Sequence, residues 1–166
     1  MVGKIIESKT NKSMKKVLRK RGNLFNRVDF DGLYSRIAHN LSRLKYCNDD
    51  SQHWIVADKR KLNMEDIEHY YGDLVGYEWT CNEIYLEGKL FNKNFKYTVP
   101  FVLDTVKKIL SESYPNEKFF INVGAQAGRL SNIYIHFHLY RENCYYIDTN
   151  IENYLDACMY EIVDFS

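Results

Sequence analysis

Two histidines separated by one residue are the sharpest candidates for chemistry in this chain. His136 and His138 lie in a segment that alternates apolar and polar residues. Residues i and i+2 of a strand share a face, so both imidazoles are placed to bind one metal ion. A catalytic zinc site needs a third ligand, and only Glu142 or Asp148 follows, without an HExxH motif. We therefore expect two histidines on the polar face of an antiparallel strand, with no metal bound.

Two further segments fall short of catalytic motifs. The stretch 124–128 carries two glycines after an expected strand, but it lacks the Lys-Ser/Thr of a P-loop and the third glycine of a dinucleotide site. We expect a turn there. Cys144 lies near the histidines in sequence and Cys81 lies among acids, yet neither belongs to a nucleophile motif. The sequence thus indicates no catalytic residue and no cofactor, and we expect a protein that is not an enzyme.

Charge is sorted along the chain, although the formal net charge is only +1. Residues 1–28 contain nine Lys or Arg and a single acid. We expect this part to be basic and partly mobile, with residues 1–12 frayed. Lysines and arginines between positions 4 and 27 are able to contact phosphates, which makes nucleic-acid binding one alternative function. No helix-turn-helix, RNP or zinc module supports it.

Two acidic stretches are rich in aromatic residues. Residues 63–88 contain seven acids and residues 142–166 contain six, and neither stretch contains Lys or Arg. Carboxylates speed encounter with a basic partner, and buried rings supply binding energy at interfaces. We expect the two stretches to converge in one docking face. The predicted partner-binding residues are Glu65, Asp66, Glu68, Tyr70, Tyr71, Asp73, Asp148, Glu152 and Asp156.

Composition and length indicate one folded domain over residues 1–166. The chain is 45% hydrophobic and 27% charged, which is ordinary for a globular protein. No apolar run approaches the roughly 18 residues of a membrane span. The N-terminus lacks the apolar core and cleavage site of a secretory signal, so we expect a cytoplasmic protein with reduced thiols.

Hydrophobic periodicity predicts helices and strands that would position these residues. A stripe formed by Leu33, Ile37, Leu41 and Leu44 is typical of a helix with one buried face. We expect helices at 13–21, 32–46, 63–71 and 98–113, the last capped by Thr98 with Pro100 in its first turn. Expected strands are 53–57, 84–86, 118–123, 131–140, 144–147 and 159–163. Residues 77–90 otherwise fit neither period.

This order of elements predicts an α+β fold. The C-terminal half reads as an antiparallel meander, and helices are expected to pack on one face of its sheet. Neither internal repeats nor low-complexity segments are visible.

The C-terminal third resembles small immunity proteins of bacterial toxin systems, including contact-dependent growth inhibition. The resemblance rests on the strand Ile133-Tyr-Ile-His-Phe-His-Leu-Tyr-Arg141 and the acidic segment Ile147-Asp-Thr-Asn-Ile-Glu-Asn-Tyr-Leu-Asp156. It implies a non-enzymatic antitoxin that blocks one cognate toxin, often a nuclease. The basic N-terminus departs from the acidic profile that such inhibitors usually show.

The sequence thus predicts a protein that binds a basic partner and covers its active site. A nucleic-acid-binding accessory protein and a metal-dependent hydrolase using His136 and His138 are the alternatives.

Overall fold

The computed structural model shows an α+β fold and describes residues 3–19, 28–50, 52–57, 62–88, 91–126 and 132–166. In chain order, the strands are β1 (Lys4–Thr10), β2 (Lys45–Asn48), β3 (His53–Val56), β4 (Glu83–Glu87), β5 (Lys118–Gln126), β6 (Asn132–Leu139) and β7 (Ala157–Asp164). The helices are α1 (Lys12–Arg19), α2 (Phe30–Leu41), α3 (Met64–Tyr71), α4 (Leu74–Cys81), α5 (Phe91–Ser113) and the 3-10 helix η2 (Ile151–Asn153).

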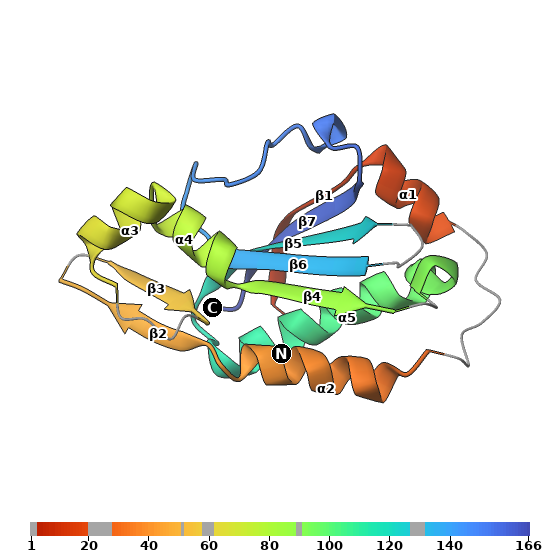
Figure 1. The fold of residues 1–166 in the computed structure, drawn as a ribbon, viewed down its shortest axis with the longest axis horizontal. Helices are drawn as coiled ribbons and strands as arrows, with labels where there is room; N and C mark the ends of the chain where they lie inside the picture. The colour runs from red at the N-terminus through yellow and green to blue at the C-terminus, as the bar shows by residue number, and fades with distance from the viewer. Residues whose placement is uncertain (1–2, 20–27, 51, 58–61, 89–90, 127–131) are drawn as a thin grey trace.

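Five strands form one antiparallel sheet in the order β1-β7-β5-β6-β4. β5 and β6 pair with each other, and β7 then returns to the opposite side of β5 instead of following β6. The first strand of the chain therefore occupies one edge of the sheet and β4 occupies the other. β2 and β3 form a separate two-stranded sheet at one end of the molecule (Figure 1).

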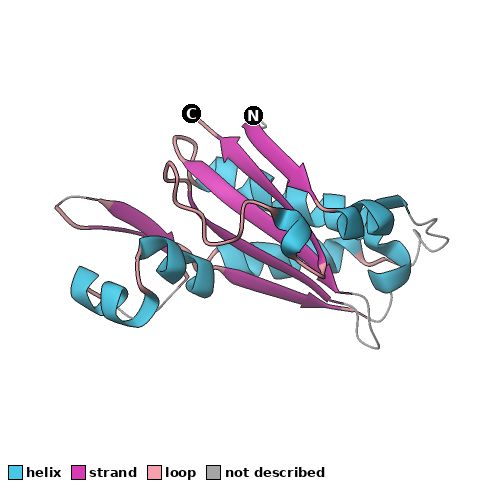
Figure 2. Cartoon of the chain, turned by 90° about the horizontal axis from the view of Figure 1, so that it is seen from above, coloured by secondary structure: helices cyan, strands magenta, loops and turns pink. Residues whose placement is uncertain are grey.

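Helices α1, α2 and α5 cover one face of the large sheet, as the sequence predicts (Figure 2). Alternation in the strands sends every second side chain to that face, including Ile121 in β5 and Ile135 in β6. They pack against Ile37 of α2 and Val106 of α5. A smaller core between β3, α3 and α4 lies beside the main one.

Three predicted boundaries were wrong for identifiable reasons. Residues 4–10 are not frayed but form β1, an exposed edge strand with a bulge between Ile5 and Glu7, which leaves no buried stripe in its sequence. Helix α5 begins at Phe91, so Pro100 lies inside it, and the hydroxyl of Thr98 donates to the carbonyl of Asn94 instead of capping. Residues 144–147 form no strand, and only a single bridge joins Arg141 to Cys144.

Two elements escaped the sequence pattern. Helix α4 buries five successive residues from Leu74 to Glu78, so no amphipathic period marks it. β2 begins just after α2, which ends at Leu41 and not at residue 46. None of the helices in the described ranges is both long and apolar enough to cross a membrane.

Candidate protein-binding face

Helix α3 presents part of the predicted acidic site to solvent. Asn63 caps the helix by accepting the backbone N–H of Asp66 at 2.8 Å, and Gly72 ends it with a φ of 82°. Glu65 and Glu68 are exposed, and the side chain of Tyr70 is 69% exposed. These three side chains are therefore available to a partner.

Of the other three predicted residues of this stretch, Asp66 is half-buried in the first turn of α3, whereas Asp73 and Tyr71 contribute to the fold. Asp73 caps α4 by accepting the N–H of Gly76 at 2.7 Å. The ring of Tyr71 packs on that of Tyr77, with centroids 4.8 Å apart, at the edge of the smaller core.

The C-terminal acids belong to a turn that is built largely from its own side chains. Asp148 accepts the N–H of Asn150 at 2.8 Å and the side-chain amide of Asn153, and these bonds lower the pKa of its carboxyl. Glu152 accepts the backbone N–H of Lys12 at 3.1 Å, at the start of α1. Asp156 is exposed.

The predicted acids of α3 and those around η2 do not converge in one face. Helix α3 lies at one end of the long axis of the molecule, whereas η2 lies beside α1 toward the other end (Figures 1 and 2). The local sequence that clusters acids along the chain carries no information about which end of the sheet each segment reaches. A single face made from all nine predicted residues is therefore not formed.

A different surface gathers acids and rings on the second face of the large sheet. The exposed side chains of β4 on this face are Glu83, Tyr85 and Glu87. In the antiparallel register, Tyr85 stands opposite Tyr134 of β6, and Glu83 stands opposite His136. Directly opposed side chains of neighbouring strands are in contact range, so these residues form one continuous patch.

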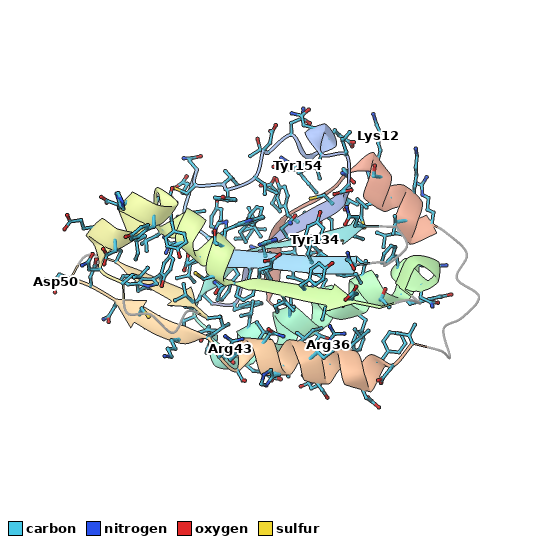
Figure 3. All side chains as sticks on the ribbon, viewed as in Figure 1. Lys12, Arg36, Arg43, Asp50, Tyr134 and Tyr154 are labelled. Atoms are coloured by element: carbon cyan, nitrogen blue, oxygen red, sulfur yellow. The ribbon has the colours of Figure 1, made fainter. Side chains whose placement is uncertain are left out.

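Tyr134 is held flat against the sheet by a glycine on the next strand. A Cβ atom built on Gly124 would lie 1.9 Å from Cζ of Tyr134, so only glycine leaves room for the ring. Figure 3 shows Tyr134 at the middle of the sheet, with Tyr154 beyond it on the segment that joins η2 to β7. Burial, with added effects of Asp156, Cys158 and Tyr154, raises the pKa of Tyr134 to about 12. Asp156 directly precedes β7, whose Ala157 and Cys158 pair with Ala125 and Gly124 of β5, so it borders the same patch.

We call Glu83, Tyr85, Glu87, Tyr134 and Asp156 the open sheet face. β4, β6 and residues 142–156 contain no Lys or Arg in their sequences. The segments that build this face therefore supply no Lys or Arg to neutralise its carboxylates. The field of these carboxylates favours a cationic partner.

A ladder of stacked rings borders the open sheet face. The rings of His136 and Trp79 are parallel within 2° with centroids 4.5 Å apart, and Tyr146 stacks on Trp79 at 5.1 Å. Nδ1 of His136 lies 3.1 Å from the carbonyl oxygen of Trp79, and Nε2 lies 3.7 Å from Glu83. The side chain of Tyr146 is 53% exposed, so the ladder reaches the surface.

His138 belongs to the buried layer below this ladder and not to the surface. Its ring stacks on Phe120 with centroids 5.0 Å apart, and Nδ1 lies 2.7 Å from the carbonyl oxygen of Leu139. Burial lowers the pKa of His138 to about 4, which keeps the ring neutral. Among the described residues, no group of three or more His, Cys, Asp or Glu is placed to hold a metal ion.

A buried charge pair fixes α4 and β3 to the sheet. Glu78, which is fully buried, accepts the N–H of Ile55 at 2.9 Å and a guanidinium N–H of Arg141. Arg141 also donates to the carbonyl oxygens of His53 and Leu139. Burial raises the pKa of Glu78 to about 7 although Arg141 opposes that shift. The pair fixes Glu78 and thereby the neighbouring Trp79, four residues before β4, in position for the ladder.

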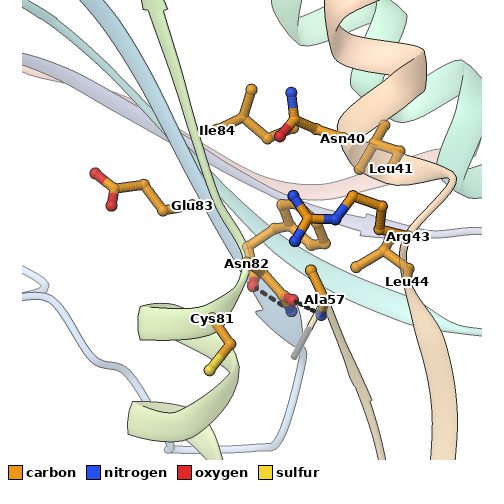
Figure 4. Close-up of a pocket in the computed structure, with 10 residues that line it drawn as sticks. Asn40, Leu41, Arg43, Leu44, Ala57, Cys81, Asn82, Glu83 and Ile84 are labelled. Atoms are coloured by element: carbon orange, nitrogen blue, oxygen red, sulfur yellow. Dashed lines mark hydrogen bonds between the residues drawn. The ribbon is translucent and has the colours of Figure 1, made fainter. Parts of the chain in front are cut away.

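A small cavity lies on the other side of β4, between its start and the end of α2. Its volume is about 70 Å³, and Arg43, Asn82 and Glu83 are among its lining residues (Figure 4). Asn82 is committed to the fold, since it accepts the N–H of Ala57 at 3.0 Å and donates to the carbonyl of Ile55 at 2.6 Å. A cavity of this size holds one or two water-sized groups and no larger substrate.

The residues of the open sheet face, apart from Asp156, were missed as site residues in the sequence. Alternation in residues 131–140 placed Tyr134 on the polar face, and Tyr85 was visible within the first acidic stretch. What the sequence lacked was the pairing of β4 with β6, which brings together residues about 50 positions apart.

Comparison with known proteins adds a family but no characterised relative. Searches among curated proteins and among solved structures found no match. The model of one family matches residues 9–166, which include all of the open sheet face. The chain therefore belongs to the uncharacterized protein PM0498 family.

Proposed function

We propose that this protein is an immunity protein that neutralises a basic protein toxin by binding it through the open sheet face. The observation that carries the proposal is the row Glu83, Tyr85 and Glu87, exposed on β4 beside Tyr134 of β6. Acids and rings in one patch, on strands that contain no Lys or Arg, suit a cationic protein surface. The resemblance of residues 118–165 to toxin-immunity proteins agrees with this function.

The mechanism is steric and stoichiometric. Carboxylates at the border of the face raise the rate of encounter with Lys and Arg around the active site of the toxin. The rings of Tyr85 and Tyr146 then lose their exposed area to the partner, and such aromatic contacts govern how long the complex lasts. A nuclease is the favoured target because its active site binds a polyanion and is therefore basic.

We place the acids of α3 outside the main interface. Glu65 and Glu68 lie at the far end of the long axis from η2, and the main docking patch lies on the sheet between them. These two acids therefore provide a matched control, because changing them removes the same charge from a different place.

Co-expression with the product of the gene directly upstream tests the proposal. We expect that product to arrest growth and the wild-type protein to restore it. Tyr85→Ala combined with Glu83→Gln and Glu87→Gln should reduce the affinity for that product at least about 100-fold, the size expected for a hot spot and its border charges. Growth and titration calorimetry are the measurements.

The matched control is Glu65→Gln with Glu68→Gln, which should rescue growth as well as the wild type does. A harmless upstream product, or full rescue by the triple variant of the open sheet face, would contradict the proposal. Circular dichroism of both variants checks that the fold is intact.

Nucleic-acid binding remains the second candidate because α1 exposes four cationic residues. Lys12, Lys15, Lys16 and Arg19 are all exposed on this helix. Such a row is able to contact successive phosphates in a salt-dependent manner without reading sequence. Of the other basic residues of the predicted segment, Lys4 and Lys9 belong to β1, and those at positions 20–27 lie outside the described ranges.

A further inference from the structure

We infer that the open sheet face contains a recognition site for an arginine side chain, centred on Tyr85 between Glu83 and Glu87. This inference rests on the proposed function and names the group of the partner that the face selects. Tyr85 is paired with Tyr134 in the register of β4 and β6. The two carboxylates flank Tyr85 along the same face of β4.

The ring of Tyr85 provides a flat support for a planar cation, since this residue is 51% exposed. The ring of Tyr134 lies over Gly124 of β5, on the side of β6 away from β4, and is half-buried. A guanidinium is planar and weakly hydrated, and it stacks on aromatic faces better than an ammonium does.

The carboxylates provide the counter-charge at the border of this support. Residues two apart on a strand are separated by roughly 7 Å, so Glu83 and Glu87 approach a cation over Tyr85 from opposite sides. Asp156 lies near Tyr134, because it precedes β7, whose Cys158 pairs with the Gly124 that the Tyr134 ring covers. A guanidinium offers five N–H donors in a plane and can bond these acids while it stacks, whereas an ammonium offers three donors at one point.

No cation from the segments that build the face competes for this place. β4, β6 and residues 142–156 contain no Lys or Arg, and Arg141 is engaged with Glu78 and two carbonyl oxygens. Among the described residues, Lys9 of β1 pairs with Glu7 at 3.1 Å, at the opposite edge of the sheet from β4. Arg36 of α2 reaches Glu87, but it donates to the backbone carbonyl oxygen, at 3.3 Å, and not to the carboxylate, which is left for an arginine from another protein.

Peptides of six arginines and six lysines test the inference without knowledge of the toxin. Titration calorimetry at low ionic strength should show hexa-arginine binding about fivefold more tightly than hexa-lysine. Tyr85→Ala should bring the two affinities to the same value, while Tyr85→Phe keeps the preference because the π face remains. Amide shifts in NMR spectra should change in β4 and β6.

Charge controls separate this site from general attraction. Glu83→Gln with Glu87→Gln should weaken both peptides, whereas Glu65→Gln with Glu68→Gln on α3 should leave the preference for arginine unchanged. Equal affinities in the wild type, a preference that survives in Tyr85→Ala, or shifts confined to α3 would overturn the inference.

The two proposals fail in different ways. If the upstream product is neutralised through the open sheet face but the peptides bind equally, only the arginine site is wrong. If hexa-arginine is preferred through Tyr85 but the triple variant still restores growth, the neutralising function is wrong and the arginine site stands.

Discussion

Two buried titratable side chains, Glu78 and His138, have opposite pKa shifts, and Arg141 acts on both. Burial raises the pKa of Glu78 from 4.5 to about 7, and burial lowers the pKa of His138 from 6.5 to about 4. Arg141 bonds to Glu78 and also lowers the pKa of His138. Both groups favour their neutral form because the fold removes them from water.

These shifts predict opposite dependences of stability on pH. The stabilising contribution of protonated Glu78 is complete below pH 4.5 and is lost as the pH rises through about 7. That of neutral His138 is complete above pH 6.5 and is lost as the pH falls through about 4. Between pH 4.5 and 6.5 the contribution of Glu78 falls with pH while that of His138 rises. The free energy of unfolding of the wild-type protein therefore changes little with pH from these two groups.

Single substitutions should separate the two contributions in urea unfolding curves measured at several pH values. In His138→Phe, only Glu78 of the two groups still titrates. The free energy of unfolding of this variant should therefore fall by about 3 kcal/mol, relative to wild type, as the pH rises from 4.5 to about 7. In Glu78→Gln, the free energy of unfolding should instead rise, relative to wild type, as the pH rises from about 4 to 6.5. Parallel profiles for wild type and both variants would show that neither group titrates with a shifted pKa.

At the scale of elements, one asparagine joins the first helix to the last strand. Asn11 is 1% exposed and accepts the N–H groups of Met14, at 2.8 Å, and Cys158, at 3.1 Å. Its amide donates to the carbonyl of Asp156 at 2.8 Å. Asn11 therefore caps α1 and fixes the segment that carries Asp156 of the open sheet face.

Asn11→Ala should lower the free energy of unfolding by about 2 to 4 kcal/mol, because it removes a helix cap and leaves buried backbone groups without partners. The substitution should speed hydrogen exchange at residues 150–156 more than it speeds exchange in β5. The neighbouring change Ser13→Ala is the control, since the hydroxyl of Ser13 makes only a partly exposed bond of 3.4 Å to Leu155. Equal effects of the two substitutions would contradict the role of Asn11.

Across the whole molecule, cationic and anionic surfaces occupy different places. The exposed cations of α1 lie at the end of the molecule that also carries η2, while the open sheet face lies on β4 and β6. The proposed inhibitor needs the second surface, and a nucleic-acid-binding protein needs the first. Deleting residues 1–22 does not separate these functions, because that deletion removes β1 from the sheet.

Lys15→Gln combined with Lys16→Gln and Arg19→Gln separates them without removing a strand. We expect this variant to restore growth in the co-expression assay within about twofold of wild type, since exposed charges outside an interface change affinity little. Weak binding to single-stranded DNA at low salt should decrease, because each lost phosphate contact lowers the salt-dependent affinity. Loss of rescue with the triple variant would favour the nucleic-acid function instead.

Local patterns in the sequence predicted those elements that carry a regular buried stripe. Helix α3 and strands β5, β6 and β7 were predicted because their core-facing residues recur at the period of the element. The same reasoning missed β1, whose side chains are mostly exposed, and α4, whose residues 74–78 are all buried. Neither an exposed edge nor a wholly buried helix leaves a period to detect.

The sequence by itself determined the α+β class and the antiparallel pairing of the C-terminal half. It also showed two stretches, 63–88 and 142–166, that carry acids and aromatic residues but no Lys or Arg. These properties depend on neighbours along the chain. Only the tertiary structure decided which acids and rings act together. It separates α3 from η2 and places Tyr85 opposite Tyr134 through strand pairing. Strand register between distant segments is set by packing of the whole sheet, and no local pattern encodes it.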